Sequence, residues 1–201
     1  MRCLIFTGPD NYDINRHYKP QQGDYVIGAD QGALFLAKHG HTFDLALGDF
    51  DSVSRAELEL ITKYANDVKR VPSEKDETDT DLAVQHAQDM NAEKIIVYGG
   101  LGGRFDHSLA NLSLLRRGNV TLVTDDVIMY MLSPNTYDIE NHYKYISLFA
   151  IEDITGLTLK GFKYDLDHVD LKVGDPLGVS NQGEGHISFD AGLLLVIHQN
   201  E

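Results

Sequence analysis

The chain has 201 residues, of which 42% are hydrophobic, so it can build the core of one large domain or two small ones. Its 17 Lys and Arg residues stand against 31 Asp and Glu residues, and the formal charge of −14 argues against a surface that binds nucleic acid or an anionic membrane. One cysteine excludes an internal disulfide, and no apolar run is long enough to cross a bilayer, so we expect a soluble, cytoplasmic protein with no nucleic-acid or membrane partner.

The first 120 residues alternate short apolar runs with segments of helical periodicity. Strands are predicted at CLIFTG, DYVIGAD, LALGD, KRV and KIIVYGG, which are residues 3–8, 24–30, 45–49, 69–71 and 94–100. This alternation is typical of an α/β domain with a mainly parallel sheet, which we assign to residues 1–122.

Two capping boxes predict helix N-termini directly after acid-rich loops. Ser54 with Glu57 starts one helix, which we expect to reach Ala65, and Thr78 with Asp81 starts another. The acidic loops therefore lie at the junctions between strands and helices.

The pattern changes near residue 119 to short strands joined by turn-rich loops. These strands are predicted at residues 119–125, 127–132, 143–151, 156–164, 170–175, 185–189 and 192–199. Because no long helix interrupts them, they indicate an antiparallel sandwich or barrel, and we assign residues 123–201 to an all-β, sandwich-like second domain.

The first acidic stretch is GDFDS, residues 48–52, at the end of a predicted strand. In an extended chain, Asp49 and Asp51 point to the same side, about 6.5 to 7 Å apart at Cα. A hard divalent cation such as Mg²⁺ offsets the repulsion between two such carboxylates. A solvated loop with both acids in water is the alternative for this motif alone.

The second acidic stretch is EKDETDTDLA, residues 74–83, which also follows a strand and enters a helix. Two acid clusters at one edge of a sheet favour a shared ligand, since α/β sheets bind ligands at the carboxyl ends of their strands. Taken singly, Asp79 and Asp81 are equally well explained as first-turn residues of the helix. A calcium loop is excluded by the spacing of the acids and the missing glycine.

The third stretch is YGGLGGRFDH, residues 98–107, where a strand runs into four glycines and an arginine. Glycines let backbone N–H groups approach phosphate oxygens, and Arg104 adds a planar set of donors. The spacing matches neither a Walker A loop nor a dinucleotide fingerprint. Asp106 is most simply an N-cap, and His107 is either a phosphate contact or a surface residue. With the acidic stretches, this loop predicts a site for a magnesium nucleotide and phosphoryl-type transfer.

Five motifs in this order resemble those of the thiamine pyrophosphokinase family, with the bacterial members most similar in pattern. They are GADQGA (28–33), LGDFDS (47–52), EKDETD (74–79), GGLGGRFDH (99–107) and GVSNQ (178–182), the last followed by GLLLVIHQ. The resemblance spans nearly the whole chain. It implies an enzyme, a thiamine diphosphokinase that transfers the diphosphate of ATP to the hydroxyl of thiamine and yields thiamine diphosphate and AMP.

The resemblance also implies roles for individual residues. The catalytic set is Asp49, Asp51, Asp79 and Arg104, and the first three of these would hold Mg²⁺. The nucleotide, as co-substrate, would be bound by Asp30, Gly102, Gly103, Arg104, Asp106 and His107. Thiamine would be held by Ser180 and Asn181 of the second domain, in a composite site across the interface of a homodimer.

Two features depart from the family pattern. The chain has no tryptophan, which mammalian members place near thiamine, and Gln182 stands where many bacterial members have Glu. The residues that stack on thiamine, and the general base, are therefore left open. The alternatives to the kinase are a metal-dependent phosphoesterase and a nucleotide-sensing module without turnover.

Overall fold

The computed structural model describes residues 1–8 and 12–200. The chain divides into two compact units, Met1–Asp125 and Asp126–Glu201. The domain boundary that we placed between residues 122 and 123 stays a prediction. Within the described part of the chain, no helix combines the length and the apolar character needed to cross a membrane.

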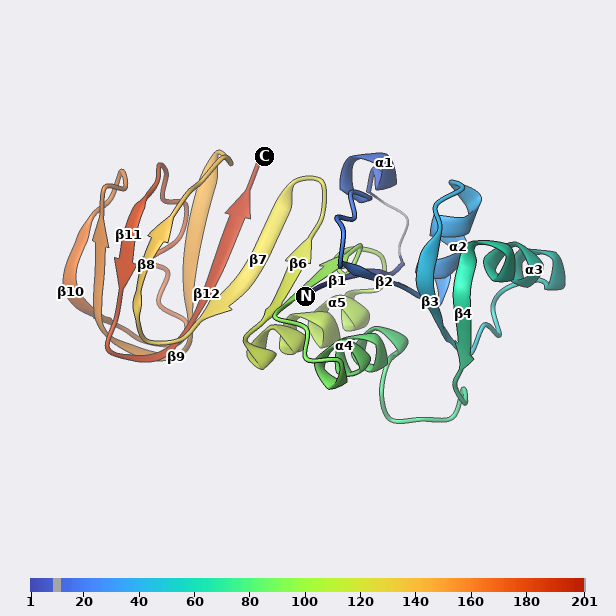
Figure 1. The fold of residues 1–201 in the computed structure, drawn as a ribbon. Helices are drawn as coiled ribbons and strands as arrows, with labels where there is room; N and C mark the ends of the chain where they lie inside the picture. Colours follow the sequence, from blue (N-terminus) through green and yellow to red (C-terminus); the bar gives the residue numbers. More distant parts are fainter. Residues whose placement is uncertain (9–11, 201) are drawn as a thin grey trace. The chain divides into compact units, whose positions relative to one another are not determined.

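The first unit contains a parallel sheet of six strands (Figure 1, blue through green). Its strands are β1 (Arg2–Phe6), β2 (Tyr25–Ala29), β3 (Phe43–Gly48), β4 (Ala65–Arg70), β5 (Lys94–Tyr98) and β6 (Val120–Val123). Their order across the sheet is β4-β3-β2-β1-β5-β6, and every pair is parallel. The chain thus builds outward from β1 in one direction and then in the other, which creates a ligand-binding switch point at the carboxyl ends of the central strands.

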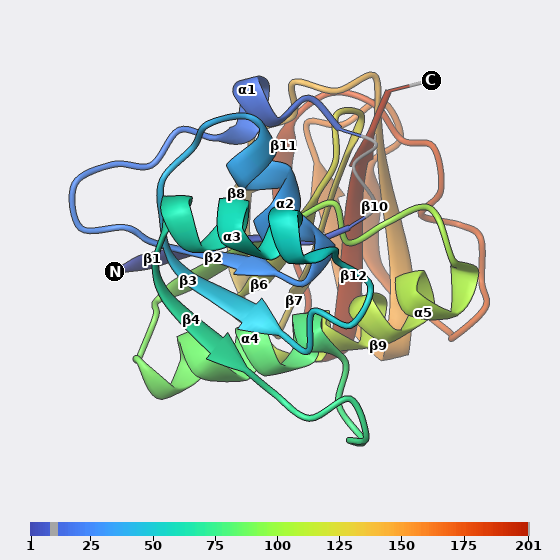
Figure 2. The same ribbon diagram turned by 90° about the vertical axis from the view of Figure 1, so that its right-hand side faces the viewer.

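Helices cover both faces of this sheet, as Figure 2 shows, with α2 and α3 on one face and α4 and α5 on the other. The helices are α1 (Ile14–His17), α2 (Gln31–Lys38), α3 (Arg55–Tyr64), α4 (Asp79–Asp89), α5 (Phe105–Leu114) and the short 3-10 helix η1 (Leu115–Arg117). A Cβ on Gly32 would lie 2.0 Å from the carbonyl oxygen of Phe6, so glycine is required where α2 packs on the end of β1. The prediction of an α/β domain with a parallel sheet is confirmed.

The two predicted capping boxes have different outcomes. The box of Ser54 and Glu57 is complete, with both reciprocal hydrogen bonds present. In the second predicted box, the Thr78 side chain accepts a hydrogen bond from the Asp81 backbone. The Asp81 carboxylate pairs with Arg117 at 2.6 Å instead of returning a hydrogen bond to the Thr78 backbone, so this half of the prediction is wrong. The helix after Ser54 is also shorter than predicted, because Ala65 already pairs with β3 as the first residue of β4.

The second unit is antiparallel throughout its paired strands (Figure 1, yellow to red). Its strands are β7 (Val127–Leu132), β8 (Thr136–Ile139), β9 (Tyr145–Lys160), β10 (Leu166–Leu171), β11 (Gly185–Ser188) and β12 (Ala191–Gln199). The first part of β9 pairs with β12, and its last residues pair with β10 and β11. Gly156, with φ of +69°, lies at this change of partner. The strands enclose a core that includes Leu148, Leu157 and Val196, as expected for the predicted sandwich-like domain.

Several predicted strands of the later region differ from the structure. Residues 119–125 contain β6, which is parallel to β5 and belongs to the first sheet. The predicted strands 143–151 and 156–164 form the single strand β9. The strand predicted at 170–175 lies earlier, at Leu166–Leu171, and β8 was not predicted. Each difference arises where pairing partners distant in sequence, rather than local apolar periodicity, decide which residues extend.

Candidate active site

A cavity of about 780 Å³ lies at the carboxyl ends of the strands in the first unit. Its walls come from the ends of β1 and β2, from the loops after β3, β4 and β5, and from one face of α2. Of the described residues, five carboxylates line it: Asp30, Asp49, Asp76, Glu77 and Asp79. The basic side chains that line it are Lys38, Lys75 and Arg104. Acids outnumber bases, so the cavity is suited to a cation or to an anion that brings one with it.

Asp30 lies at the N-cap position of α2, directly after β2, with φ of +45°. Its side chain makes no capping hydrogen bond, and within the described chain its Oδ1 is buried without a hydrogen-bond partner. A non-glycine residue with positive φ and an unsatisfied buried oxygen is costly, which points to a role in binding. Burial and then the negative charge of Asp79, with smaller contributions from Asp49 and Asp51, raise the pKa of Asp30, although a backbone hydrogen bond from Gln31 opposes the shift.

The GDFDS loop is not extended, contrary to the geometry expected from the sequence. Phe50 has φ of +56° and is buried in the core, so the chain turns sharply between the two aspartates. Asp49 lines the cavity, whereas Asp51 is exposed and donates its backbone N–H to Asp49 Oδ1 at 3.1 Å. The turn also meets α2, because Gln31 donates to the Ser52 hydroxyl at 2.6 Å.

The EKDETD stretch carries Asp79 into the cavity as the first residue of α4. Asp79 forms an ion pair with Lys75 at 3.0 Å. Its neighbour Thr80 is buried and shares a hydrogen bond of 3.0 Å with Thr7 at the end of β1, which fixes the start of α4 against the sheet.

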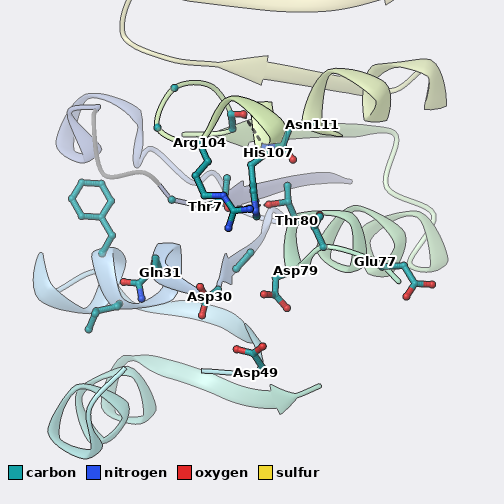
Figure 3. A pocket seen from close by; sticks show the side chains of 18 of the residues that line it. Thr7, Asp30, Gln31, Asp49, Glu77, Asp79, Thr80, Arg104, His107 and Asn111 are labelled. Atoms are coloured by element: carbon teal, nitrogen blue, oxygen red, sulfur yellow. Dashed lines mark hydrogen bonds between the residues drawn. The ribbon is translucent and has the colours of Figure 1, made fainter. Parts of the chain in front are cut away.

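Three carboxylates meet in this cavity. Asp30, Asp49 and Asp79 each offer one oxygen, and these three oxygens lie within 4.8 Å of one another. Figure 3 shows their carboxyl groups turned toward a shared space, with Arg104 and His107 reaching toward it from the opposite side. Asp30 Oδ1 is buried without a hydrogen-bond donor among the described residues, which leaves room for a hard cation as its partner. These residues therefore fit Mg²⁺.

The glycine-rich loop after β5 forms the opposite wall of the cavity. Gly102 and Gly103 have φ of +94° and +65°, which explains the need for glycine at these positions. The Gly102 backbone N–H donates to the Ser108 hydroxyl at 3.1 Å, so this amide is already used within the loop. Asn111 of α5 is buried and donates to the Gly100 carbonyl at 2.8 Å, which anchors the loop to the helix.

Arg104 and Asp106 form a two-point pair, with nitrogen–oxygen distances of 3.1 and 2.6 Å. The guanidinium lowers the pKa of Asp106 to about 2. Asp106 is not the N-cap that we predicted, because α5 begins at Phe105 and Arg104 takes the cap position. The Asp106 carboxylate thus orients the arginine instead of capping the helix. His107 lines the cavity beside them.

Sequence reasoning missed several residues of the cavity. Thr7, Gln31, Lys75, Thr80 and Asn111 were not predicted as site residues, although all line it. Gln31, Lys75 and Thr80 lie within or beside the quoted motifs. Thr7 lies near the end of the first predicted strand, so position relative to a strand end was the available signal. Asn111 lies one helical turn beyond GGRFDH, and no local pattern marks it.

In the second unit, the GVSNQ motif forms a loop held against β9. Ser180 is exposed with φ of +61°, and its backbone N–H donates to the Ser147 hydroxyl at 3.0 Å. The Asn181 side chain is buried, accepts hydrogen bonds from the backbones of Tyr164 and Gln182, and donates to the Tyr164 carbonyl. Asn181 therefore serves to shape the loop, while Ser180 is presented to solvent.

Comparisons with known proteins agree with this arrangement over the whole chain. Residues 18–123 match the family model of the thiamin pyrophosphokinase catalytic domain, and residues 136–194 match that of the thiamin pyrophosphokinase vitamin B1 binding domain. A thiamine pyrophosphokinase of Bacillus subtilis (strain 168) is 37% identical over 209 aligned positions, which cover 98% of each chain.

Solved structures of similar proteins share the fold. The crystal structure of thiamine pyrophosphokinase from Bacillus subtilis superposes with a TM-score of 0.90 at 34% identity, covering 100% of this chain and 99% of that one. The thiamin pyrophosphokinase from Geobacillus thermodenitrificans gives a TM-score of 0.89 at 29% identity, covering 100% and 98%. The resemblance predicted from the five motifs is confirmed: the chain belongs to the thiamin pyrophosphokinase family, the enzymes that convert thiamine to thiamine diphosphate with ATP.

Proposed function

We propose that the protein transfers the β,γ-diphosphate of ATP to thiamine at the cavity of the first unit. The thiamine hydroxyl oxygen forms a bond to the β-phosphorus and its proton passes to solvent, while the bond from that phosphorus to the α,β-bridging oxygen breaks and AMP leaves. The observation that carries this proposal is the group of Asp30, Asp49 and Asp79 opposite Arg104. Attack at phosphorus needs alignment and charge neutralisation more than a covalent nucleophile, and this site supplies both.

We assign Mg²⁺ to Asp30, Asp49 and Asp79. The ion, when bound, neutralises charge on the phosphates during transfer. Asp30 was predicted to bind the nucleotide and not the metal, and its unpartnered buried oxygen supports a role as metal ligand. The family resemblance assigned Asp51 to the metal, but Asp51 is exposed and lies outside this group. We propose that Asp51 acts through its negative charge, which contributes to the raised pKa of Asp30.

We propose that Arg104 binds the polyphosphate of ATP, with Gly102, Gly103 and His107 shaping the same wall. Asp106 holds the guanidinium in one plane. Phosphate oxygens accept the same parallel pair of donors, so the nucleotide competes with Asp106 for Arg104. No residue is assigned as general base.

We propose that thiamine is bound with the help of Ser180 and Asn181, in a cytoplasmic homodimer whose active sites combine both domains from different subunits. The contribution of Asn181 is to hold the loop that presents Ser180. Exposed apolar side chains beside the arginine, Phe105 and Leu109 on α5, support a protein–protein contact near the active site. The single cysteine fits a reducing compartment.

The products of the reaction test this function. Purified protein is incubated with ATP, Mg²⁺ and thiamine, and the nucleotides and thiamine esters are separated by chromatography. We expect AMP and thiamine diphosphate in equal amounts, both dependent on thiamine. Phosphate release without thiamine would identify a phosphoesterase, and nucleotide binding with no product would identify a sensing module.

A further inference from the structure

Lys75 is a basic residue placed inside the acidic part of the cavity. Its Nζ lies 3.0 Å from Asp79 Oδ1, and its side chain is only 13% exposed. The same ammonium donates to the Pro72 carbonyl at 3.0 Å, which tethers it to the loop after β4. Lys75 is thus held in place by its own loop and by a carboxylate of the proposed metal group.

The other basic side chains that line the cavity have different partners. Lys38 pairs with Glu57 at 3.0 Å, and Arg104 pairs with Asp106 at 2.6 Å. Neither Glu57 nor Asp106 belongs to the group of three carboxylates. Of the cavity's described basic residues, Lys75 is therefore the one whose charge directly compensates that group.

The ammonium and a divalent cation compete for the same carboxylate. Asp79 Oδ1 is buried, and the Lys75 ammonium at 3.0 Å is the positive charge that compensates it. A cation held by Asp30, Asp49 and Asp79 neutralises Asp79, so the ion pair between Asp79 and Lys75 is no longer favoured. The lysine stem is long and rotatable, so its ammonium can then reach another acceptor in the same cavity.

We propose that Lys75 is a positioning residue that neutralises Asp79 in the unloaded site and moves to a phosphate oxygen of the nucleotide when the cation binds. This inference deepens the proposed function and rests on its assignment of cation and polyphosphate to this cavity. Lys75 lowers the repulsion among the carboxylates when no cation is bound, and it couples binding of the cation to binding of the phosphates.

The proposal predicts effects of opposite sign on two ligands. Lys75→Met removes the charge and keeps a flexible stem of similar length. In this variant no ammonium competes for Asp79, so Mn²⁺ without nucleotide should bind about three- to tenfold more tightly. This range corresponds to the loss of one partly shielded charge interaction. With Mg²⁺ saturating, α,β-methylene-ATP should bind about tenfold more weakly, because a charged hydrogen bond to phosphate is lost.

The experiment measures both constants on the full chain. Electron paramagnetic resonance counts free Mn²⁺ without nucleotide, and calorimetry gives the affinity for α,β-methylene-ATP, whose α–β bond cannot be cleaved. Lys75→Arg keeps the charge and should restore the Mn²⁺ affinity of the wild type. Lys38→Met is the matched control, since it removes a charge from the same cavity without touching the carboxylate group, and should change Mn²⁺ affinity less than about twofold.

The outcomes separate the two proposals. Tighter Mn²⁺ and weaker nucleotide binding in Lys75→Met support the role of Lys75. If Lys75→Met lowers the affinity for both ligands, or leaves the affinity for Mn²⁺ unchanged, Lys75 is a structural residue and this inference is wrong. The metal assignment stands in that case. If the wild type itself binds no Mn²⁺, or if Asp30→Asn binds it normally, the metal assignment fails and the inference fails with it.

Discussion

Asp30→Asn should stabilise the protein in the absence of ligands while removing the proposed metal site. Asparagine has the shape of aspartate and, like it, tolerates positive φ, so the backbone at φ of +45° should be kept. The substitution removes one of three carboxylates whose oxygens lie within 4.8 Å of one another. At that distance two unit charges repel by about 3.5 kcal/mol at an effective dielectric of about 20.

The net gain should be smaller than this repulsion. Water reaches part of the site, and the Lys75 ammonium already offsets the charge of Asp79, so we expect about 1 kcal/mol. In a chain of 201 residues, this corresponds to a rise in Tm of about 2 to 4 °C. Asp106→Asn is the control. Asp106 is exposed and Arg104 lowers its pKa, so removal of its charge should not raise Tm.

The gain should also depend on pH with a defined sign. The folded protein raises the pKa of Asp30 above 3.8, so protonation adds stability that is fully present below 3.8 and is lost as pH rises through the folded value. The advantage of Asp30→Asn should therefore fall as pH drops through the folded pKa and vanish below 3.8.

Differential scanning calorimetry in EDTA, repeated with Mg²⁺ and α,β-methylene-ATP, measures these effects. With ligands, the wild type should gain stability and the variant should not, so the order of their Tm values should reverse. A variant that melts below the wild type in EDTA near neutral pH would show that Asp30 is a structural residue and would refute this reasoning.

Three further predictions concern the two units separately. Asp49→Asn should lower kcat by at least about 100-fold and leave the circular dichroism spectrum unchanged. Asp51→Asn should lower kcat less, because only Asp49 belongs to the carboxylate group. Equal losses of kcat in the two variants would contradict this ranking. Arg104→Lys should lower kcat/KM for ATP by about tenfold in steady-state assays, since a point charge cannot make the paired contact, and an unchanged value would remove Arg104 from the phosphate site. Asn181→Ala should destabilise the protein by about 1 to 3 kcal/mol in urea unfolding, because the backbone N–H groups of Tyr164 and Gln182 lose their acceptor; unchanged stability would contradict the role given to Asn181.

The strands β1, β2, β3 and β5 were predicted well because each is a short apolar run between helices, whereas only the end of the polar strand β4 was predicted. Local patterns failed where tertiary pairing overrides them. Ala65 continues the helical periodicity of α3, yet its backbone pairs with Phe43 and begins β4. In the second unit, β9 was predicted as two strands because the acidic pair Glu152 and Asp153 interrupts its apolar run, although the strand continues through both residues.

The candidate site was predictable at the level of its motifs, but not in its geometry. Alternation along an extended chain placed Asp49 and Asp51 together, and the buried ring of Phe50 turns the chain between them instead. Asp30 joins the carboxylate group because β2 and β3 are neighbours in the sheet, and the linear sequence does not show that adjacency by itself.

We propose that Asp30, Asp49 and Asp79 together hold the divalent cation of the reaction. Anomalous diffraction from crystals grown with Mn²⁺ and α,β-methylene-ATP tests it most directly, because the peak locates the ion and its ligands independently of turnover. We predict a peak within about 2.3 Å of one oxygen from each of these residues, with phosphate oxygens completing the shell. A peak bound by Asp51 without Asp30, or no peak in this cavity, would contradict the account.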